Sequence, residues 1–158
     1  MTARVLVVGC GGLGGIIAGT LMEQREEIGA EVVALTTNPS IASAVNARGY
    51  QLRGVDGART VRGVMASSLP DDTAPFDWII LATQPPQVED AARRTLGWLA
   101  KDGTMVCLQN GLCEKRVGAI VGDDRVAGAV VAWGATMPEP GVYDRTAAGG
   151  FTIGTMSG

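Results

Sequence analysis

Short apolar runs alternate along most of this chain with stretches that repeat apolar residues at helical spacing. Five runs are rich in apolar residues: residues 4–8, 31–35, 78–81, 104–108 and 126–133. Uninterrupted apolar runs are typical of parallel strands that are covered on both faces. Four stretches repeat apolar residues at the spacing of a helix: residues 13–21, 41–48, 88–99 and 113–121. This alternation predicts an α/β fold with a doubly wound, mostly parallel sheet and right-handed crossovers.

Glycine and proline mark where several of these elements begin or end. Gly29 and Gly49 follow the first two predicted helices, at the place where glycine commonly ends a helix. Pro85 precedes the third predicted helix, and proline is favoured at the start of a helix. Residues 51–53 and 59–62 alternate around an Asp-Gly pair, which predicts a small hairpin.

The composition is that of a folded, globular domain. The chain has 158 residues, of which 46% are hydrophobic and 18% charged, so we expect one domain with a substantial core. The formal net charge of −3 argues against nucleic acid as a partner, because nucleic-acid binding relies on basic surfaces. No run of about 18 apolar, glycine-poor residues occurs in the sequence, so we expect no membrane span.

Histidine and cysteine content limits the possible chemistry. The chain contains no histidine, which excludes imidazole catalysis and the usual zinc sites, and we expect no bound metal. The cysteines, Cys10, Cys107 and Cys113, are odd in number, and the first two lie in apolar runs. We therefore expect buried, unreactive thiols in a reducing compartment, the cytoplasm.

A glycine-rich turn follows the first predicted strand and opens the first predicted helix. Its residues are Gly9, Cys10, Gly11, Gly12, Leu13 and Gly14, which form a G-x-G-x-x-G motif. In this context the first glycine permits a tight turn, the second lets the backbone approach a pyrophosphate, and the third lets helix and strand pack closely. The motif predicts a Rossmann-like dinucleotide-binding domain, in which the start of the helix favours the anion. A purely structural glycine turn is the alternative.

The end of the second predicted strand bears on the choice of dinucleotide. An acid at this place would bind the ribose 2′-hydroxyl of NAD. This chain has Thr36, Thr37 and Asn38 instead. These side chains can donate hydrogen bonds to a 2′-phosphate, and no carboxylate repels it, so we expect NADP. Alternatively, these polar residues only cap the next helix.

Polar residues also follow two later predicted strands. Thr83 and Gln84 follow one of them, and Gln109-Asn110-Gly111 follows the other. Ligands of doubly wound sheets bind outside the carboxyl ends of the strands, so we place Thr83, Gln84 and Asn110 at the cofactor site. The amide of Asn110 could hold a nicotinamide ribose or a substrate hydroxyl, or Asn110 could form a simple turn with Gly111.

Together with later segments, these motifs resemble the N-terminal domain of the ketopantoate reductase (2-dehydropantoate 2-reductase) family over nearly the whole chain. The resemblance is carried by the glycine turn and by residues 109–111, 133–136, 140–142 and 150–154. It implies a cytoplasmic oxidoreductase of pantothenate biosynthesis that uses NADP to reduce a 2-keto acid to the 2-hydroxy acid. It also implies that Asn110 takes part in catalysis by contacting cofactor and substrate, and that Ala135 lines the cofactor.

The chain departs from the family pattern at several positions. It has Gln84 where the family often has lysine, Thr37 where it often has arginine, and Arg145 where it often has histidine. The family's proton-donating lysine lies in a helical C-terminal domain, and neither Lys101 nor Lys115 matches that role. We therefore expect residues 1–158 to be a dinucleotide-binding domain, inactive alone, whose partner is a C-terminal helical domain or a second copy of the chain.

Two other functions remain open from the sequence. The missing lysine and Gln84 would also suit a non-catalytic dinucleotide-binding or sensing module. Residues 7–14 further resemble the nucleotide loop of adenylating enzymes of the ubiquitin-activating type. That class needs acids after the second strand to bind metal and ribose, and residues 36–38 contain none, so we rank it last.

Overall fold

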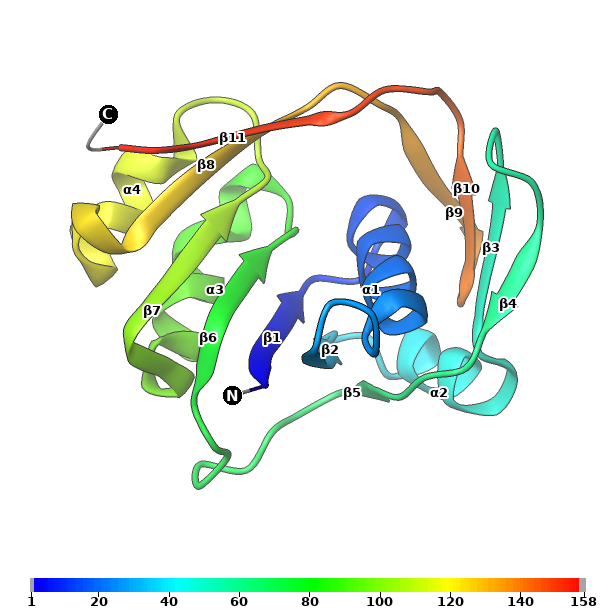
Figure 1. Cartoon of the computed structure of the whole chain (residues 1–158), viewed down its shortest axis with the longest axis horizontal. Helices are drawn as coiled ribbons and strands as arrows, with labels where there is room; N and C mark the ends of the chain where they lie inside the picture. Colours follow the sequence, from blue (N-terminus) through cyan, green and yellow to red (C-terminus); the bar gives the residue numbers. More distant parts are fainter. Residues whose placement is uncertain (1, 157–158) are drawn as a thin grey trace.

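A seven-stranded sheet runs through residues 2–156, which are the residues that the computed structural model describes (Figure 1). In sheet order, its strands are β11 (Phe151–Thr155), β8 (Val126–Val131), β7 (Leu99–Cys107), β6 (Phe76–Leu81), β1 (Ala3–Val8), β2 (Ala30–Leu35) and β5 (Met65–Ala66). Neighbouring strands are parallel except β11, which runs antiparallel to β8. The chain moves outward from β1 through β2 and β5, and then in the other direction through β6, β7 and β8. The predicted doubly wound, mostly parallel sheet is therefore confirmed.

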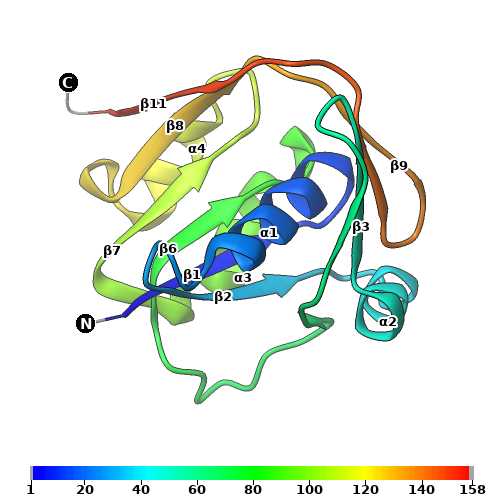
Figure 2. The same ribbon diagram turned by 45° about the vertical axis from the view of Figure 1, so that its right-hand side comes forward.

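Helices cover the two faces of this sheet unequally. They are α1 (Gly12–Gln24), α2 (Pro39–Arg48), α3 (Val88–Thr95) and α4 (Cys113–Val121). On one face, α3 and α4 contribute Val88 and Val117 to an apolar core that also contains Leu6 of β1. On the opposite face, Ala18 of α1 and Val45 of α2 belong to a second core. Figure 2 shows α1 in front of β1, with α3 behind the sheet.

A second, four-stranded sheet lies on the far side of α1, so that α1 is enclosed between two sheets (Figures 1 and 2). In order, its strands are β4 (Arg59–Val61), β3 (Tyr50–Gly54), β10 (Val142–Arg145) and β9 (Ala135–Glu139). The antiparallel β3–β4 pair is the predicted hairpin. Tyr143 packs on α1 at Gly15, where any side chain would overlap its ring. The same ring stacks on Tyr50, with the two centroids 6.2 Å apart.

Of the two predicted glycine stops, the one at Gly49 is confirmed, whereas α1 ends at Gln24 with Arg25 as its C-cap, before Gly29 is reached. Gly29, at φ 62°, closes the turns after α1, and its N–H and that of Ala30 bond back to carbonyls of the preceding turn. Gly49, at φ 80°, ends α2. Pro85 opens a short 3-10 helix rather than an α-helix, and α3 begins at Val88. The 3-10 helices are η1 (Pro85–Gln87), η2 (Leu96–Trp98) and η3 (Asp123–Arg125).

Three details of the sequence prediction were wrong. Trp78 is 45% exposed rather than buried, because it lies on the α1 side of the sheet, where no helix covers β6, while α3 and α4 pack on the opposite side. The helix predicted over residues 88–99 ends at Thr95, because η2 follows and Leu99 already lies in β7. The last predicted strand of the parallel set ends at Val131, two residues before Trp133.

Further features concern membranes, metals and thiols. None of the helices within residues 2–156 is both long and apolar enough to cross a membrane. In the same part of the chain, no three histidine, cysteine, aspartate or glutamate side chains gather where they could hold a metal ion. Cys10, Cys107 and Cys113 are buried free thiols, as the sequence predicts.

Candidate functional site

The glycine turn after β1 is built in a way that only glycine allows at two positions. Gly9 has φ 88°, and a Cβ there would lie 2.9 Å from the backbone nitrogen of Thr83. A Cβ at Gly14 would overlap the carbonyl oxygen of Gly9. The first glycine therefore makes the turn possible next to β6, and Gly14 brings α1 against the end of β1.

The middle of the turn is open. Gly11 is exposed and extended, at φ −70° and ψ −160°, and a Cβ built there would have no described heavy atom within 4 Å. Gly11 is also the N-cap of α1, and no side chain of residues 2–156 caps the helix. The start of α1 is therefore uncapped and lies beside the open space at Gly11, and an uncapped helix start is the arrangement that binds an anion such as a pyrophosphate.

The start of β9 lies against the start of α1. A Cβ at Gly12 would lie 2.9 Å from the carbonyl carbon of Thr136 and 3.0 Å from that of Ala135. The structure thus brings Ala135, which the sequence places at the cofactor only by resemblance, next to the glycine turn. Tyr143 ties the same region together, because its hydroxyl donates to the carbonyl of Cys10 at 3.3 Å.

The end of β2 joins the glycine turn through its backbone. The N–H of Gly9 donates to the carbonyl of Leu35 at 3.0 Å. Thr36 is buried, and its hydroxyl accepts from the N–H of Asn38 at 3.2 Å. The Asn38 side chain caps α2 by accepting from the N–H of Ser40 at 3.0 Å. The helix-capping interpretation therefore holds for Asn38, while Thr37 is exposed and has no side-chain hydrogen bond within residues 2–156.

Thr83 and Gln84 follow β6, on the other side of the turn. Thr83 contacts Gly9, and Gln84 is exposed. Arg116 of α4 holds the next residues in place: its guanidinium donates to the carbonyl of Pro85 at 3.1 Å and to the Glu89 carboxylate at 2.6 Å. This contact lowers the pKa of Glu89, chiefly through the hydrogen bond from Arg116.

Asn110 and Gln109 lie at the end of β7. Asn110 is exposed, and the chain then turns through Gly111 and Leu112, both at positive φ, into α4. Gln109 is buried, and its Nε2 donates to the carbonyls of Leu81 at 2.9 Å and Thr83 at 3.0 Å. The sequence analysis missed Gln109; the signal was an amide side chain directly after an apolar strand, next to Asn110.

The candidate residues therefore lie at one edge of the sheet, the carboxyl ends of β1, β2, β6 and β7. Contacts link the glycine turn with Thr83, Ala135 and the end of β2, and Thr83 with Gln109. Burial raises the pKa of the Cys10 thiol to about 12, which makes it a packing residue of the turn rather than a nucleophile. This edge includes the switch point between β1 and β6, where doubly wound sheets bind nucleotides.

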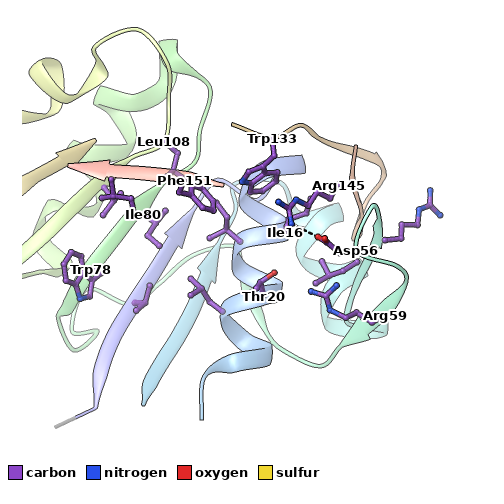
Figure 3. Close-up of a pocket in the computed structure, with 17 residues that line it drawn as sticks. Ile16, Thr20, Asp56, Arg59, Trp78, Ile80, Leu108, Trp133, Arg145 and Phe151 are labelled. Atoms are coloured by element: carbon purple, nitrogen blue, oxygen red, sulfur yellow. Dashed lines mark hydrogen bonds and ion pairs between the residues drawn. The ribbon is translucent and has the colours of Figure 1, made fainter. Parts of the chain in front are cut away.

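A cavity of about 630 Å³ opens beside this edge, over the face of β6 and β7 that no helix covers (Figure 3). Trp78, Ile80 and Leu108 line it from the sheet, and Ile16 and Thr20 line it from α1. The remaining wall contains Trp133, Phe151 and the charged residues Arg53, Asp56, Arg59 and Arg145. Its volume is in the usual range of ligand pockets, about 300–1,000 Å³, and its wall is mainly apolar.

Within residues 2–156, the two lysines and Arg145 make no hydrogen bond to the glycine turn, whereas Arg116 holds the neighbouring Pro85. Lys101 is exposed in the first part of β7, at the opposite end of that strand from Asn110. Lys115 is exposed on α4. Arg145 pairs with Asp56 at 2.7 Å, and its guanidinium lies 5.0 Å from the centre of the Trp133 ring.

Comparison with solved structures shows where this fold occurs. A PanE/ApbA family ketopantoate reductase from Ralstonia eutropha JMP134 has a TM-score of 0.83 and 24% identity, covering 95% of this chain and 48% of that one. The 2-dehydropantoate 2-reductase from Geobacter metallireducens GS-15 has a TM-score of 0.79 and 23% identity, covering 96% and 49%. A ternary structure of D-mandelate dehydrogenase with NADH and anilino(oxo)acetate has a TM-score of 0.79 and 20% identity, covering 95% and 47%. The chain thus spans about half the length of these proteins, and the similarity shows a shared fold.

Sequence comparison gives the family. No curated protein sequence matches the chain. The family model for ketopantoate reductase PanE/ApbA matches residues 5–158, nearly the whole sequence. The fold and the glycine turn at the switch point agree with this match. The chain therefore belongs to the ketopantoate reductase PanE/ApbA family.

Proposed function

We propose that this chain is the NADP-binding part of an oxidoreductase that reduces a 2-keto acid of the 2-dehydropantoate type to the 2-hydroxy acid. The observation that carries the proposal is the open space at Gly11, in front of the uncapped start of α1. A pyrophosphate fits there because free N–H groups and the helix dipole both favour an anion. Family membership, and the fold shared with a dehydrogenase solved with NADH, support the proposal.

The preference for NADP rests on the end of β2. Thr36, Thr37 and Asn38 place no carboxylate there, and the exposed Thr37 hydroxyl is available to a 2′-phosphate. An acid at this end would instead bind the 2′-hydroxyl of NAD and repel the phosphate. Titrating the chain with NADPH and NADH, followed by nicotinamide fluorescence, tests this choice, because we expect NADPH to bind more tightly.

Reduction of a keto acid adds a hydride to the carbonyl carbon and a proton to its oxygen. The bound nicotinamide supplies the hydride. The exposed amide of Asn110 would orient the nicotinamide ribose or the substrate carbonyl at the end of β7. A positioned acid contributes about 10²–10⁴-fold to such a rate, and an amide cannot take that role. Lys101 lies at the opposite end of β7, and Lys115 is exposed on the first turn of α4. Since neither lysine makes a hydrogen bond or ion pair within residues 2–156 that would position it, we propose that the acid belongs to another domain.

The uncovered face of the large sheet supports a second, helical domain beside residues 1–158. Mostly parallel sheets carry helices on both faces, yet Trp78 and Phe151 are 45% and 46% exposed here. The dye ANS, which binds exposed apolar surface, should fluoresce with the 158-residue chain and less with the variant W78K/F151K. Absence of dye binding would contradict an open docking face for that domain.

A non-catalytic dinucleotide-binding or sensing module is the second candidate. It is favoured by Gln84, which is exposed beside the glycine turn where the family often has lysine. Both candidates predict dinucleotide binding, and turnover separates them. A longer chain from the same gene that oxidises NADPH with a 2-keto acid is an enzyme, whereas one that binds NADPH without turnover is a module.

A further inference from the structure

The side chain of Gln109 bridges two strand ends at the candidate cofactor site. It is 5% exposed and extends from the end of β7 toward the end of β6. Its Nε2 lies 2.9 Å from the carbonyl oxygen of Leu81, 3.0 Å from that of Thr83 and 3.3 Å from the Thr83 hydroxyl. One carboxamide therefore holds the last residue of β6 and the second residue after it.

The other end of this carboxamide indicates which of its groups matters. Gln109 Oε1 is buried and has no hydrogen-bond partner among residues 2–156. A buried acceptor without a partner is unfavourable, whereas two donated hydrogen bonds, one to a buried and one to a partly buried carbonyl, are favourable. The side chain is therefore kept in place by its donors, which serve the segment after β6.

That segment is fixed at two points and lies against the glycine turn. Thr83 contacts Gly9, since a Cβ at Gly9 would lie 2.9 Å from both its nitrogen and its Cγ2. Arg116 holds Pro85, two residues further on, at 3.1 Å. Gln84 is thus presented between two anchored neighbours, next to the place where the dinucleotide would bind.

We propose that Gln109 is a positioning residue of the dinucleotide site: it fixes Thr83 and Gln84 beside the glycine turn without touching the dinucleotide. The inference rests on the proposed function, because it assigns a purpose to this geometry. The proposal makes a specific chemical demand: position 109 needs a side chain of this length that carries two N–H donors. A side chain that only fills the core would need the volume and not the donors.

The variant Gln109→Met tests this proposal, because it keeps the length and removes the donors. Gln51→Met is the matched control, since Gln51 Nε2 also donates to a carbonyl, that of Arg48 at 2.8 Å, but on the exposed small sheet. For Gln109→Met we expect faster amide hydrogen exchange at residues 82–84 and 87, and about tenfold weaker NADPH binding. For Gln51→Met we expect neither change. If Gln109→Met does not fold, Gln109→Asn, which is one methylene shorter, is expected to give the same two effects.

Two results would overturn the inference. One is NADPH affinity unchanged in a folded Gln109 variant, and the other is faster exchange throughout the large sheet rather than at the segment after β6. If the wild-type chain binds neither NADPH nor NADH, the proposed function fails. The exchange measurement still decides in that case whether Gln109 holds the segment.

Discussion

Replacing Gly11 with valine separates dinucleotide binding from folding. The structure gives the expected effect on stability: a Cβ at Gly11 meets no described heavy atom within 4 Å, and φ −70° lies outside the left-handed region that favours glycine. Removing a glycine favours the fold by about 0.4–1 kcal/mol in the free energy of unfolding, but valine is a poorer N-cap than glycine by a similar amount, so we expect the fold to be kept with little net change in stability. The valine methyl groups would instead fill the space in front of the N–H groups of α1. We expect at least a hundredfold loss of NADPH affinity, or about 2.7 kcal/mol.

The assay is NADPH fluorescence titration combined with thermal unfolding followed by circular dichroism. Gly97→Val is the matched control, because Gly97 also has open space around it but lies in η2, after α3. Gly14→Ala is the opposite control, since its Cβ would overlap the Gly9 carbonyl oxygen, and it should lose the fold. A folded Gly11→Val chain that binds NADPH as the wild type does would refute the reasoning, and the glycine turn would then be structural only.

Three further expectations concern specificity, activity and thiols. Thr37→Asp should lower the ratio of NADPH to NADH affinity at least tenfold, because a carboxylate at the end of β2 repels a 2′-phosphate and favours a 2′-hydroxyl; an unchanged ratio in paired titrations would place the adenosine ribose elsewhere. The 158-residue chain should show no NADPH oxidation with 2-dehydropantoate above the no-enzyme rate, and robust turnover would show that the proton donor lies within this chain. Burial raises the pKa of Cys10 and Cys107 to about 12, so only about one thiol in 10⁴ is ionised at pH 8. Mass spectrometry after iodoacetamide treatment should therefore find both cysteines unmodified in the folded chain.

The sequence predicts the succession of strands and helices along the chain, and the glycine turn between the first strand and the first helix, because both depend on local signals. The apolar run before Gly9 predicts a strand, and the helical spacing after Gly14 predicts a helix, so residues close to the turn are enough to identify it. Asn38 shows the limit of this reasoning, since donation to a phosphate and capping of α2 call for the same residue type. Only the structure shows the cap to Ser40, which leaves Thr37 as the exposed side chain that makes no hydrogen bond within residues 2–156.

The rest of the fold depends on contacts between distant segments. The second sheet forms because β10 pairs in parallel with β3, for example Val142 with Gln51, and no local pattern specifies such a partner. The exposure of Trp78 depends on whether a helix covers β6, which the apolar run alone does not reveal. The link from Gln109 to Thr83 depends on the direction of one side chain at the end of β7.

The central claim is that the turn from Gly9 to Gly14 binds a dinucleotide, with NADP preferred. Parallel titrations of the 158-residue chain with NADPH and with NADH, by isothermal calorimetry at one fixed ionic strength, test it most directly. The account predicts saturable binding at one site per chain, with the lower dissociation constant for NADPH. Saturable binding that is tighter for NADH would contradict the assignment of the β2 end, and no saturable binding of either dinucleotide would contradict the central claim itself.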